Sequence, residues 1–389
     1  MSFIHARRVL GRRNLHITMS LLLGCALFAC GGLAPTDTKA AEGQSDSIRI
    51  GAAWPLSSRQ DQFREGIQLA ADELNRGGGV LGRKVELVFA DDEGTVRVGK
   101  LVAQRFAEKE QLDAVIGHFD SHIAIAASVT YAFHNLLFIS PGATNPKLTR
   151  QGFSKVFRTC PSDTQAGAQL ADIAQSLGYR QLVVVHEQSR YGGELANAIE
   201  FRAGELDLEI TARISYSVQS GDLRLLMERL ELVEFDAVFF AGEASDAARF
   251  IRTARAEGFS APFLGGYGLD NPELFSGNHG DVEDTLVLSV FHGDNPNPYV
   301  QSFNLRFQEA YGRRPDAWAA QGYDALIMLA HGIRMAQSTE DAEVAKALHA
   351  MNAWYGVTGT HRFDAQGDVL EKAMVPKIAK NGNLAYFER

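Results

Sequence analysis

Hydrophobic and polar positions alternate along the chain in blocks that predict strands and helices in turn. From residue 48 onward, short apolar runs bounded by turn residues are followed by longer stretches with apolar residues at helical spacing. Short runs of this kind are typical of buried parallel strands, and the longer stretches are typical of amphipathic helices. In the first part of the chain the pattern predicts strands over 48–53, 84–89, 114–116 and 136–139, and helices over 63–75, 98–108 and 123–134.

A second series of such blocks begins after Arg158. It predicts strands over 181–186, 210–216, 237–240, 262–265 and 286–290, and helices over 165–177, 193–204, 223–232 and 246–258. Three more helices are expected over 298–311, 317–335 and 341–351. Near the end of the chain, the segments 357–368 and 373–378 are expected to pair as strands.

The regular alternation predicts an α/β fold with two doubly wound parallel sheets. A length of 389 residues suits two lobes rather than one compact core. We expect lobe 1 to comprise residues 48–159 plus 290–358, and lobe 2 residues 160–289 plus 359–389, joined by a multi-strand hinge. Two sheets whose strand ends face each other leave a ligand cleft between the lobes.

The stretch 113–149 carries the first candidate binding residues. Ser121 and Thr144 each follow the carboxyl end of a predicted strand, which is the edge of an open α/β sheet where small ligands bind. A hydroxyl together with free N–H groups at a helix start makes a site for a carboxylate. The same side chains also suit helix N-caps, so both interpretations stay open.

The composition describes an ordinary globular protein, with 22% charged residues, 46% hydrophobic residues and a formal net charge of −9. Because the first 29 residues carry four arginines and no acid, the rest of the chain is more acidic still. Binding to nucleic acid requires basic patches that neutralise phosphates. The acidic body therefore excludes nucleic acid as a partner.

The N-terminus predicts a targeting segment. Four arginines precede an apolar run over 17–29 that is too short to span a bilayer. The following Leu27-Phe28-Ala29-Cys30-Gly31 is similar to a bacterial lipobox, which implies a lipoprotein-type signal peptide over 1–29 and a lipid on the sulfur of Cys30. A plain secretory signal remains the alternative. Residues 30–47 are small and polar, and we expect them to form a flexible tether.

The cysteines do not predict a disulfide. Cys25 leaves with the signal segment and Cys30 takes the lipid, so only Cys160 remains. A lone cysteine close to apolar Phe157 is typical of a small buried residue rather than a nucleophile.

No catalytic signature is present in the sequence, which lacks a Gly-x-Ser-x-Gly elbow, a His-Glu-x-x-His motif and a Walker loop. We therefore expect no enzymatic activity and no cofactor. His118 and His122 stand four apart with Asp120 between them, a spacing that could suggest a metal site, but they straddle a strand-to-helix turn, so we expect none. The acidic run 91–93 is interpreted as a solvated strand end.

Residues 48 to about 380 resemble the branched-chain amino-acid (Leu/Ile/Val) binding proteins of bacterial ABC importers, which have the type I periplasmic binding fold. The resemblance rests on an ordered set of motifs: Asn75-Arg76-Gly77-Gly78-Gly79-Val80-Leu81-Gly82, Val115-Ile116-Gly117-His118, Ile139-Ser140-Pro141-Gly142-Ala143-Thr144, Tyr191-Gly192, Ala254-Arg255-Ala256-Glu257-Gly258, Gly322-Tyr323-Asp324-Ala325 and Phe363-Asp364-Ala365-Gln366-Gly367-Asp368.

This resemblance implies a set of ligand-binding residues. In the family, the ligand's carboxylate and amino group are held mainly by the first lobe, the second lobe supplies an aromatic side chain and two loops, and further residues cap the side chain. The positions that match are Ser121, Gly142, Ala143 and Thr144 in the first lobe, Tyr191, Glu243 and Tyr267 in the second, and Trp318, Trp54 and Arg59 around the cap.

Two departures from the family pattern bear on the ligand. The amino-acid binders normally carry an acid where Tyr267 stands and an aromatic where Glu243 stands, so the two residue types are exchanged here. If Glu243 faces the cleft, the ligand keeps a cationic or hydrogen-donating group; if it faces solvent, an uncharged or anionic ligand fits better. Asp120 occupies a position that some relatives use for a disulfide.

The function that this resemblance implies is binding of a small polar ligand, such as an amino acid or an amide, and its delivery to an ABC permease in the inner membrane. We expect a monomer in the periplasm or cell envelope whose only membrane contact is the lipid on Cys30. Two alternatives stay open: a receptor domain that senses the ligand, and an envelope lipoprotein that uses the same fold to bind a protein partner.

Overall fold

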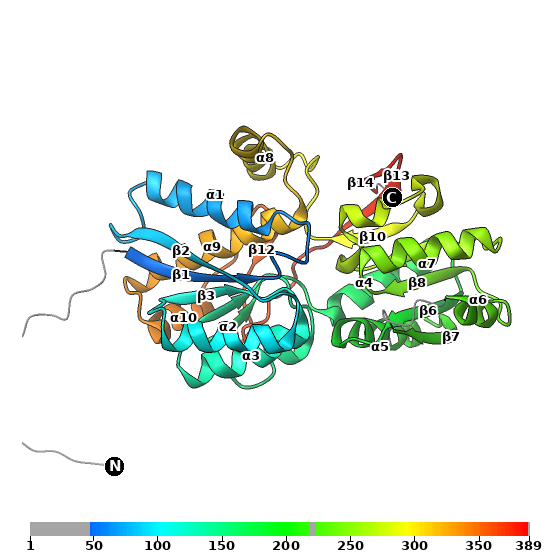
Figure 1. Ribbon diagram of the computed structural model, residues 1–389, viewed down its shortest axis with the longest axis horizontal. Helices are drawn as coiled ribbons and strands as arrows, with labels where there is room; N and C mark the ends of the chain where they lie inside the picture. Colours follow the sequence, from blue (N-terminus) through cyan, green and yellow to red (C-terminus); the bar gives the residue numbers. More distant parts are fainter. Residues whose placement is uncertain (1–46, 218–222, 388–389) are drawn as a thin grey trace, which may run out of the picture. The chain divides into compact units, whose positions relative to one another are not determined.

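A computed structural model describes residues 47–217 and 223–387 (Figure 1). The predicted signal peptide, Cys30 and the tether as far as residue 46 lie outside the described residues. Within the described ranges, no helix has both the length and the hydropathy needed to cross a membrane.

The first lobe is built on a five-stranded parallel sheet in the order β2-β1-β3-β4-β5. Its strands are β1 (Ser47–Trp54), β2 (Lys84–Asp91), β3 (Ala114–Gly117), β4 (Phe138–Ser140) and β5 (Val156–Arg158). The strand order changes direction between β1 and β3, so the loops after these two strands border the crevice where open α/β sheets bind ligands. The sequence analysis missed β5, because a three-residue strand has no readable period.

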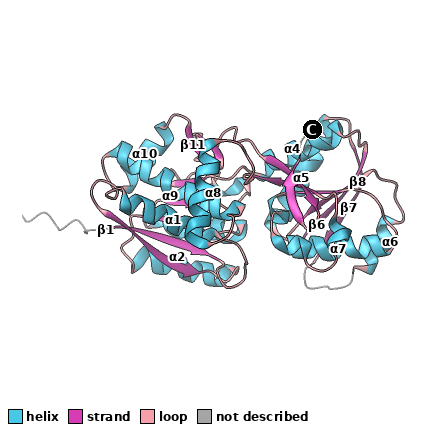
Figure 2. Cartoon of the chain, turned by 90° about the horizontal axis from the view of Figure 1, so that it is seen from above, coloured by secondary structure: helices cyan, strands magenta, loops and turns pink. Residues whose placement is uncertain are grey.

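Helices from distant parts of the chain complete this lobe (Figures 1 and 2). They are α1 (Phe63–Arg76), α2 (Val96–Glu108), α3 (Ser121–Phe133), α8 (Pro298–Tyr311), α9 (Ala317–Ala336) and α10 (Asp341–Ala350). In α1, Phe63, Ile67, Ala70 and Leu74 recur at helical spacing and are buried, so one face of the helix packs on the core. Helix α9 begins where Asp316 accepts a hydrogen bond from the backbone N–H of Ala319, and it packs against α1.

The second lobe is built on a seven-stranded sheet in the order β14-β13-β10-β9-β8-β6-β7. Its strands are β6 (Gln181–Glu187), β7 (Glu209–Tyr216), β8 (Ala237–Ala241), β9 (Phe263–Gly265), β10 (Leu286–Ser289), β13 (Val375–Lys380) and β14 (Asn383–Tyr386). Helices α4 (Asp163–Ser176), α5 (Arg190–Glu205), α6 (Arg224–Leu230) and α7 (Ala244–Ala256) accompany it (Figure 2). The α/β class and the parallel sheets predicted from the alternating pattern are confirmed.

The predicted pairing of segments 357–368 and 373–378 is wrong. Strand β13 pairs antiparallel with β10 and with β14, whereas β11 (Trp354–Gly356) and β12 (Gly359–His361) form a small hairpin of their own. The chain turns from β13 into β14 through Asn381 and Gly382, whose φ angles are 51° and 76°. Two positive φ angles in a two-residue loop define the type I′ hairpin turn that Asn-Gly favours, so the sequence did carry this signal.

Three links connect the two sheets: residues 159–162, 290–297 and 362–374. The ammonium of Lys372 ties the first and third links together, because its Nζ donates to the carbonyl of Thr159 at 2.8 Å and to Thr358 Oγ1 at 2.7 Å. Burial lowers the pKa of Lys372 to about 8, although nearby Asp324 favours the charged form. A buried cation with several acceptors fixes these segments relative to one another.

Gly66 on α1 tests the close contact between α1 and α9. A Cβ at this position would lie 2.0 Å from the backbone oxygen of Ala319, so Gly66→Ala is expected to destabilise the protein by about 2 kcal/mol through overpacking. As a control, Gly204→Ala in α5 places a Cβ with no atom within 4 Å and should be neutral or stabilising by about 0.5–1 kcal/mol. Urea unfolding measures both, and equal effects would contradict the close contact.

Candidate ligand-binding site

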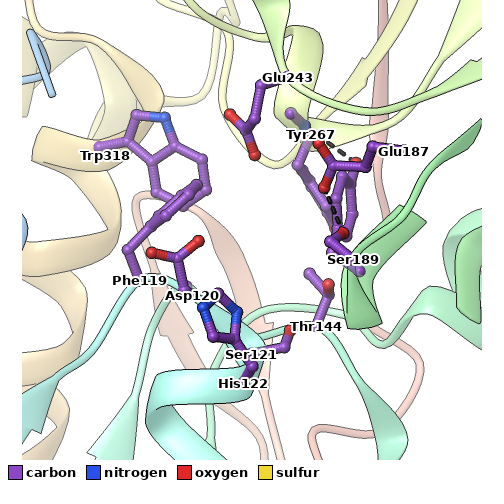
Figure 3. A pocket seen from close by; sticks show the side chains of 13 residues that line it. Phe119, Asp120, Ser121, His122, Thr144, Glu187, Ser189, Glu243, Tyr267 and Trp318 are labelled. Atoms are coloured by element: carbon purple, nitrogen blue, oxygen red, sulfur yellow. Dashed lines mark hydrogen bonds between the residues drawn. The ribbon is translucent and has the colours of Figure 1, made fainter. Parts of the chain in front are cut away.

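A cavity of about 210 Å³ lies between the loops that follow strands of both sheets (Figure 3). A cavity of this size suits a ligand of amino-acid size. Its lining comes from the loops after β3, β4, β6, β8 and β9, and from the start of α9. The lining residues are Phe119, Asp120, Ser121, His122, Gly142, Thr144, Glu187, Ser189, Tyr191, Glu243, Tyr267, Gly268 and Trp318.

The structure brings most of the sequence-predicted site residues to this cavity and leaves three outside its lining. Those that line it are Ser121, Gly142, Thr144, Tyr191, Glu243, Tyr267 and Trp318. Ala143 is buried in the loop after β4, where its N–H donates to Ser140 Oγ at 3.1 Å. Trp54 is stacked on Phe63 at a centroid distance of 4.0 Å, so it supports the cavity wall from behind. Arg59 lies beside the cavity and reaches it through Glu243.

Ser121 does not act as a helix cap. Its Oγ accepts a hydrogen bond from the backbone N–H of Asn145 at 3.2 Å, which joins the loops after β3 and β4. Thr144 is not a cap either, because Asn145 caps the short helix that follows it and Ser162 caps α4. Both hydroxyl side chains line the cavity, so the capping interpretation is wrong.

A buried arginine positions the Thr144 loop. Arg158, at the end of β5, is fully buried and donates from Nη1 to the carbonyl oxygens of Thr144 at 3.0 Å and Asn145 at 2.7 Å. Its Nε donates to Asp368 Oδ1 at 3.0 Å, in the third link between the sheets. The guanidinium therefore fixes the loop backbone and leaves the side chain of Thr144 on the cavity side.

A buried chain of three side chains supports the loop after β3. His118 Nδ1 lies 2.6 Å from Asp92 Oδ2, and His118 Nε2 lies 3.0 Å from Tyr131 Oη on α3. All three side chains are fully buried, so the interpretation of Asp92 as a solvated strand end is wrong. This network holds the loop that carries Asp120 and Ser121 between β2, β3 and α3.

Six lining residues were absent from the predicted set: Phe119, Asp120, His122, Glu187, Ser189 and Gly268. Asp120 and His122 had been considered only in other roles, a disulfide position and a metal pair. Among the described residues, no group of three His, Cys, Asp or Glu side chains is placed to hold a metal ion. Burial, aided by the charge of Arg190, lowers the pKa of His122, so at neutral pH it lines the cavity as an uncharged imidazole.

Three carboxylates reach the cavity. Burial and the charge of Glu243 raise the pKa of Asp120 to about 7 and that of Glu187 to about 8. Burial also raises the pKa of Glu243, although Arg59 opposes this shift. Figure 3 shows Asp120 near Phe119 and Trp318 on one side of the cavity, and Glu187 with Ser189 on the other. These acids form a strongly negative cavity when they are ionised.

Arg59 crosses from the first lobe to the second. Its Nη1 lies 3.0 Å from Glu243 Oε2 and its Nε lies 2.9 Å from Asp61 Oδ2. The guanidinium packs over the ring of Phe119 at 3.6 Å and lies 5.6 Å from the ring centre of Trp318. Burial alone would lower the pKa of Arg59, but the negative charges and hydrogen bonds of Glu243 and Asp61 outweigh this effect, so the pKa of Arg59 is raised. The sequence left open whether Glu243 faces the cleft, and the structure shows that it does.

The aromatic residues leave polar atoms for a ligand. Tyr267 Oη and Trp318 Nε1 are buried without a hydrogen-bond partner in the described part of the chain. Burial raises the pKa of Tyr267, so its phenol is neutral and can donate a proton to an acceptor. Tyr191 is used within the second lobe, since its Oη accepts from the N–H of Gly268 at 3.0 Å.

Asp120→Asn tests the raised carboxylate pKa. The folded state holds a proton on Asp120 up to about pH 7, whereas the unfolded state releases it near pH 4, so stability falls as pH rises through this window. The unligated variant is therefore expected to be more stable than the wild type at pH 8 by about 1–2 kcal/mol, with little gain at pH 4. Urea unfolding at both pH values measures this. The surface control Glu257→Gln should show no such difference, and a gain for Asp120→Asn that does not depend on pH would contradict the shift.

Comparison with known proteins confirms the resemblance seen in the sequence. Residues 47–382 match the family model described as periplasmic binding protein. Leu/Ile/Val-binding protein homolog 1 of Brucella abortus (strain 2308) is 31% identical over 347 residues, which cover 88% of this chain and 90% of the relative.

Solved structures agree. An ABC transporter substrate-binding protein of Desulfitobacterium hafniense, in complex with Leu, is 36% identical with a TM-score of 0.80, and the match covers 88% of this chain and 100% of that one. A leucine-binding protein from Thermotoga maritima is 29% identical with a TM-score of 0.82, covering 88% and 98%. The chain belongs to the branched-chain amino-acid (Leu/Ile/Val) binding proteins of the type I periplasmic binding family.

Proposed function

We propose that this chain is the substrate-binding lipoprotein of an ABC importer and that it binds an amino acid in the cavity between its lobes. The observation that carries the proposal is the pairing of two hydroxyl side chains, Ser121 and Thr144, with carboxylates from the opposite lobe around one small cavity. A molecule with an anionic and a cationic end fits this arrangement. The family's substrate-binding proteins work in the periplasm, and the solved relatives include one in complex with Leu.

The first lobe is suited to the carboxylate end of the ligand. Ser121 is the first residue of α3, so the free N–H groups of the helix start lie beside its hydroxyl. Ser121 Oγ accepts from Asn145 and keeps its own O–H for a ligand acceptor. Gly142 lets this site form, because a Cβ there would lie 2.9 Å from both Phe119 Cα and the ring of Trp54. A carboxylate held by two hydroxyls and helix N–H groups needs no arginine in the cavity lining.

The second lobe is suited to the ammonium end. Glu187 follows β6 and Glu243 follows β8, and both line the cavity. An ammonium buried without an anion would cost several kcal/mol, so acids at these positions favour a cationic group on the ligand. Glu243 thereby replaces the acid that the amino-acid binders carry at the position of Tyr267.

A ligand bound in this way contacts both lobes. A delivery protein needs such a ligand-dependent change in the arrangement of its lobes. The carboxylate partners belong to the first lobe and the ammonium partners to the second, so a bound amino acid stabilises the approach of the lobes. A permease can then distinguish the loaded protein from the empty one by its closed form. The cavity residues serve binding, and we propose no enzymatic step for them.

Ser121→Ala and Thr144→Ala test the carboxylate end. Each change removes a donor to a buried, charged acceptor and is expected to weaken binding of an amino-acid ligand by about 1–3 kcal/mol. Calorimetry with a ligand identified by thermal-shift screening measures the loss. Thr130→Ala, on α3 but outside the cavity lining, should leave the affinity unchanged. Unchanged affinity in both cavity variants would show that these two hydroxyl groups do not bind the ligand.

Cys30→Ser tests the lipid anchor. A lipid on Cys30 contributes about 0.8 kcal/mol per buried CH₂ to membrane binding, so the variant is expected to leave the membrane fraction. Cys25→Ser is the matched control, because Cys25 belongs to the segment that is expected to be removed. Fractionation of expressing cells measures both. If Cys30→Ser still fractionates with membranes, the lipobox interpretation is wrong.

A further inference from the structure

The cavity holds more carboxyl groups than an ordinary amino acid requires. Asp120, Glu187 and Glu243 line it, and neither lysine nor arginine is among the lining residues. An α-amino acid brings one ammonium and one carboxylate, and the carboxylate is accounted for by neutral donors. One acid is therefore enough to pair with the ammonium of such a ligand, and the other two acids of the lining have no partner on it.

Arg59 compensates the remaining acids only in part, because its charge favours ionised Asp120 but it forms no ion pair with Asp120 or Glu187. Its guanidinium is already paired with Asp61 at 2.9 Å and with Glu243 at 3.0 Å, so it compensates the charges of the pairs to which it belongs. Glu187 receives a hydrogen bond from Ser189, which is a neutral donor. Asp120 has no side-chain hydrogen bond or ion pair to any residue in the described ranges. Its carboxylate is thus the clearest unpaired acid of the cavity.

The wall around Asp120 is suited to a cation. Phe119 and Trp318 lie beside it in Figure 3, with ring centroids 4.9 Å apart in an edge-to-face arrangement. The guanidinium of Arg59 already packs on this same aromatic pair. Aromatic faces attract cations, and more strongly in a desolvated site. Among the lining residues, Tyr267 has a buried Oη without a partner in the described residues, and this oxygen can accept from a ligand ammonium, whereas Trp318 Nε1–H can only donate and serves no cation.

An apolar ligand side chain would leave Asp120 in an unfavourable state. Contact with a leucine side chain would take water from the carboxyl group and return no hydrogen bond, so Asp120 would either keep its proton or bear the several kcal/mol that a buried, unpaired charge costs. A cationic group at the same place removes this cost and adds a charge-assisted hydrogen bond. Charge balance therefore favours a cation next to Asp120.

We propose that the ligand is an α-amino acid with a cationic side chain, of the ornithine or lysine class, whose side-chain ammonium pairs with Asp120. The α-carboxylate lies at Ser121 and Thr144, the α-ammonium at Glu187 and Glu243, and the side chain runs along Phe119 and Trp318. This inference rests on the proposed function, since it assumes that the cavity takes an amino acid. Such a ligand differs in charge from the Leu that is in complex with the solved relative from Desulfitobacterium hafniense.

The pKa values of the cavity acids determine how the affinity for a cationic ligand changes with pH. Burial, then Glu243, raise the pKa of Asp120 to about 7, with Asp92 adding to the rise and Arg59 opposing it. For Glu187, whose pKa is about 8, burial and Glu243 are followed by Ser189, which opposes the rise, and by Asp120 and Asp246. His122 faces the same space as a neutral imidazole at neutral pH.

A cationic ligand favours the ionised acids, so it releases their protons on binding. Its affinity is expected to rise between about pH 6 and pH 8.5. A neutral ligand that accepts hydrogen bonds from the protonated acids would show the opposite trend.

The direct test compares matched ligands on the wild-type protein by calorimetry. L-lysine and L-ornithine are compared with L-norleucine, which has the same kind of chain without the terminal ammonium, and with L-leucine. The cationic amino acids are expected to bind at least about tenfold more tightly, the equivalent of one pKa unit of differential interaction. Equal or tighter binding of norleucine or leucine would overturn the cationic-ligand inference and leave the proposed function standing. Binding of none of the four would count against both.

The variant Asp120→Asn tests whether Asp120 is the residue that causes the preference for cationic amino acids. The change keeps the side-chain shape and removes the charge, so the lysine-over-norleucine ratio is expected to fall towards one while norleucine binding is kept or improved. Retained norleucine binding also shows that the variant is folded. Glu257→Gln, which removes the same charge from an exposed position, should preserve the ratio. A ratio that survives in Asp120→Asn would overturn the pairing with Asp120.

Discussion

The bridge from Arg59 to Asp61 and Glu243 is the interaction on which the cavity depends. It joins the loop after β1 of one sheet to the loop after β8 of the other, so it is both a contact between lobes and part of the cavity's charge balance. A buried ion pair adds little net stability compared with apolar packing, yet removing one partner leaves the other charge buried and unpaired. Arg59 therefore makes the presence of Glu243 tolerable, and the flat guanidinium gains further from packing over Phe119.

The loops around this bridge are held by buried polar groups rather than by their own backbone regularity. Asp92, His118 and Tyr131 form a chain behind the Asp120–Ser121 loop, and Arg158 holds the carbonyl groups of Thr144 and Asn145. Each group is fully buried or nearly so and satisfied by a specific partner, so these loops have few alternative arrangements. A rigid arrangement of donors lowers the cost of ordering them when a ligand arrives.

The repeating α/β pattern could be predicted from the sequence because strands and helices are recognised by the spacing of hydrophobic residues, which is a local property of the chain. The sequence analysis missed β5, which is too short to show a period, and β14, although Asn381-Gly382 signalled the hairpin. For the cavity, it found residues that match family motifs, such as Ser121 and Thr144. It missed Glu187 and misread Asp92, because an acid at the end of a strand looks the same in sequence whether water or protein surrounds it. Only packing separates these cases. Asp120 was likewise missed, since the ligand ammonium that we propose as its partner is not part of the chain.

Membership of the family and identity of the ligand depend on different residues. The match to the family extends over residues 47–382, whereas the charges in the cleft come from a few loop positions. Acids from both lobes repel one another as the lobes approach, and this repulsion grows as water leaves the cleft. An amino acid with a neutral side chain brings one ammonium, which can offset the charge of one of these acids. An amino acid with a cationic side chain brings two, which can offset the charges of two acids. If the ligand is the cationic amino acid that we propose, its charge contributes to closure itself, because the free energy that brings the lobes together includes the repulsion that the ligand removes.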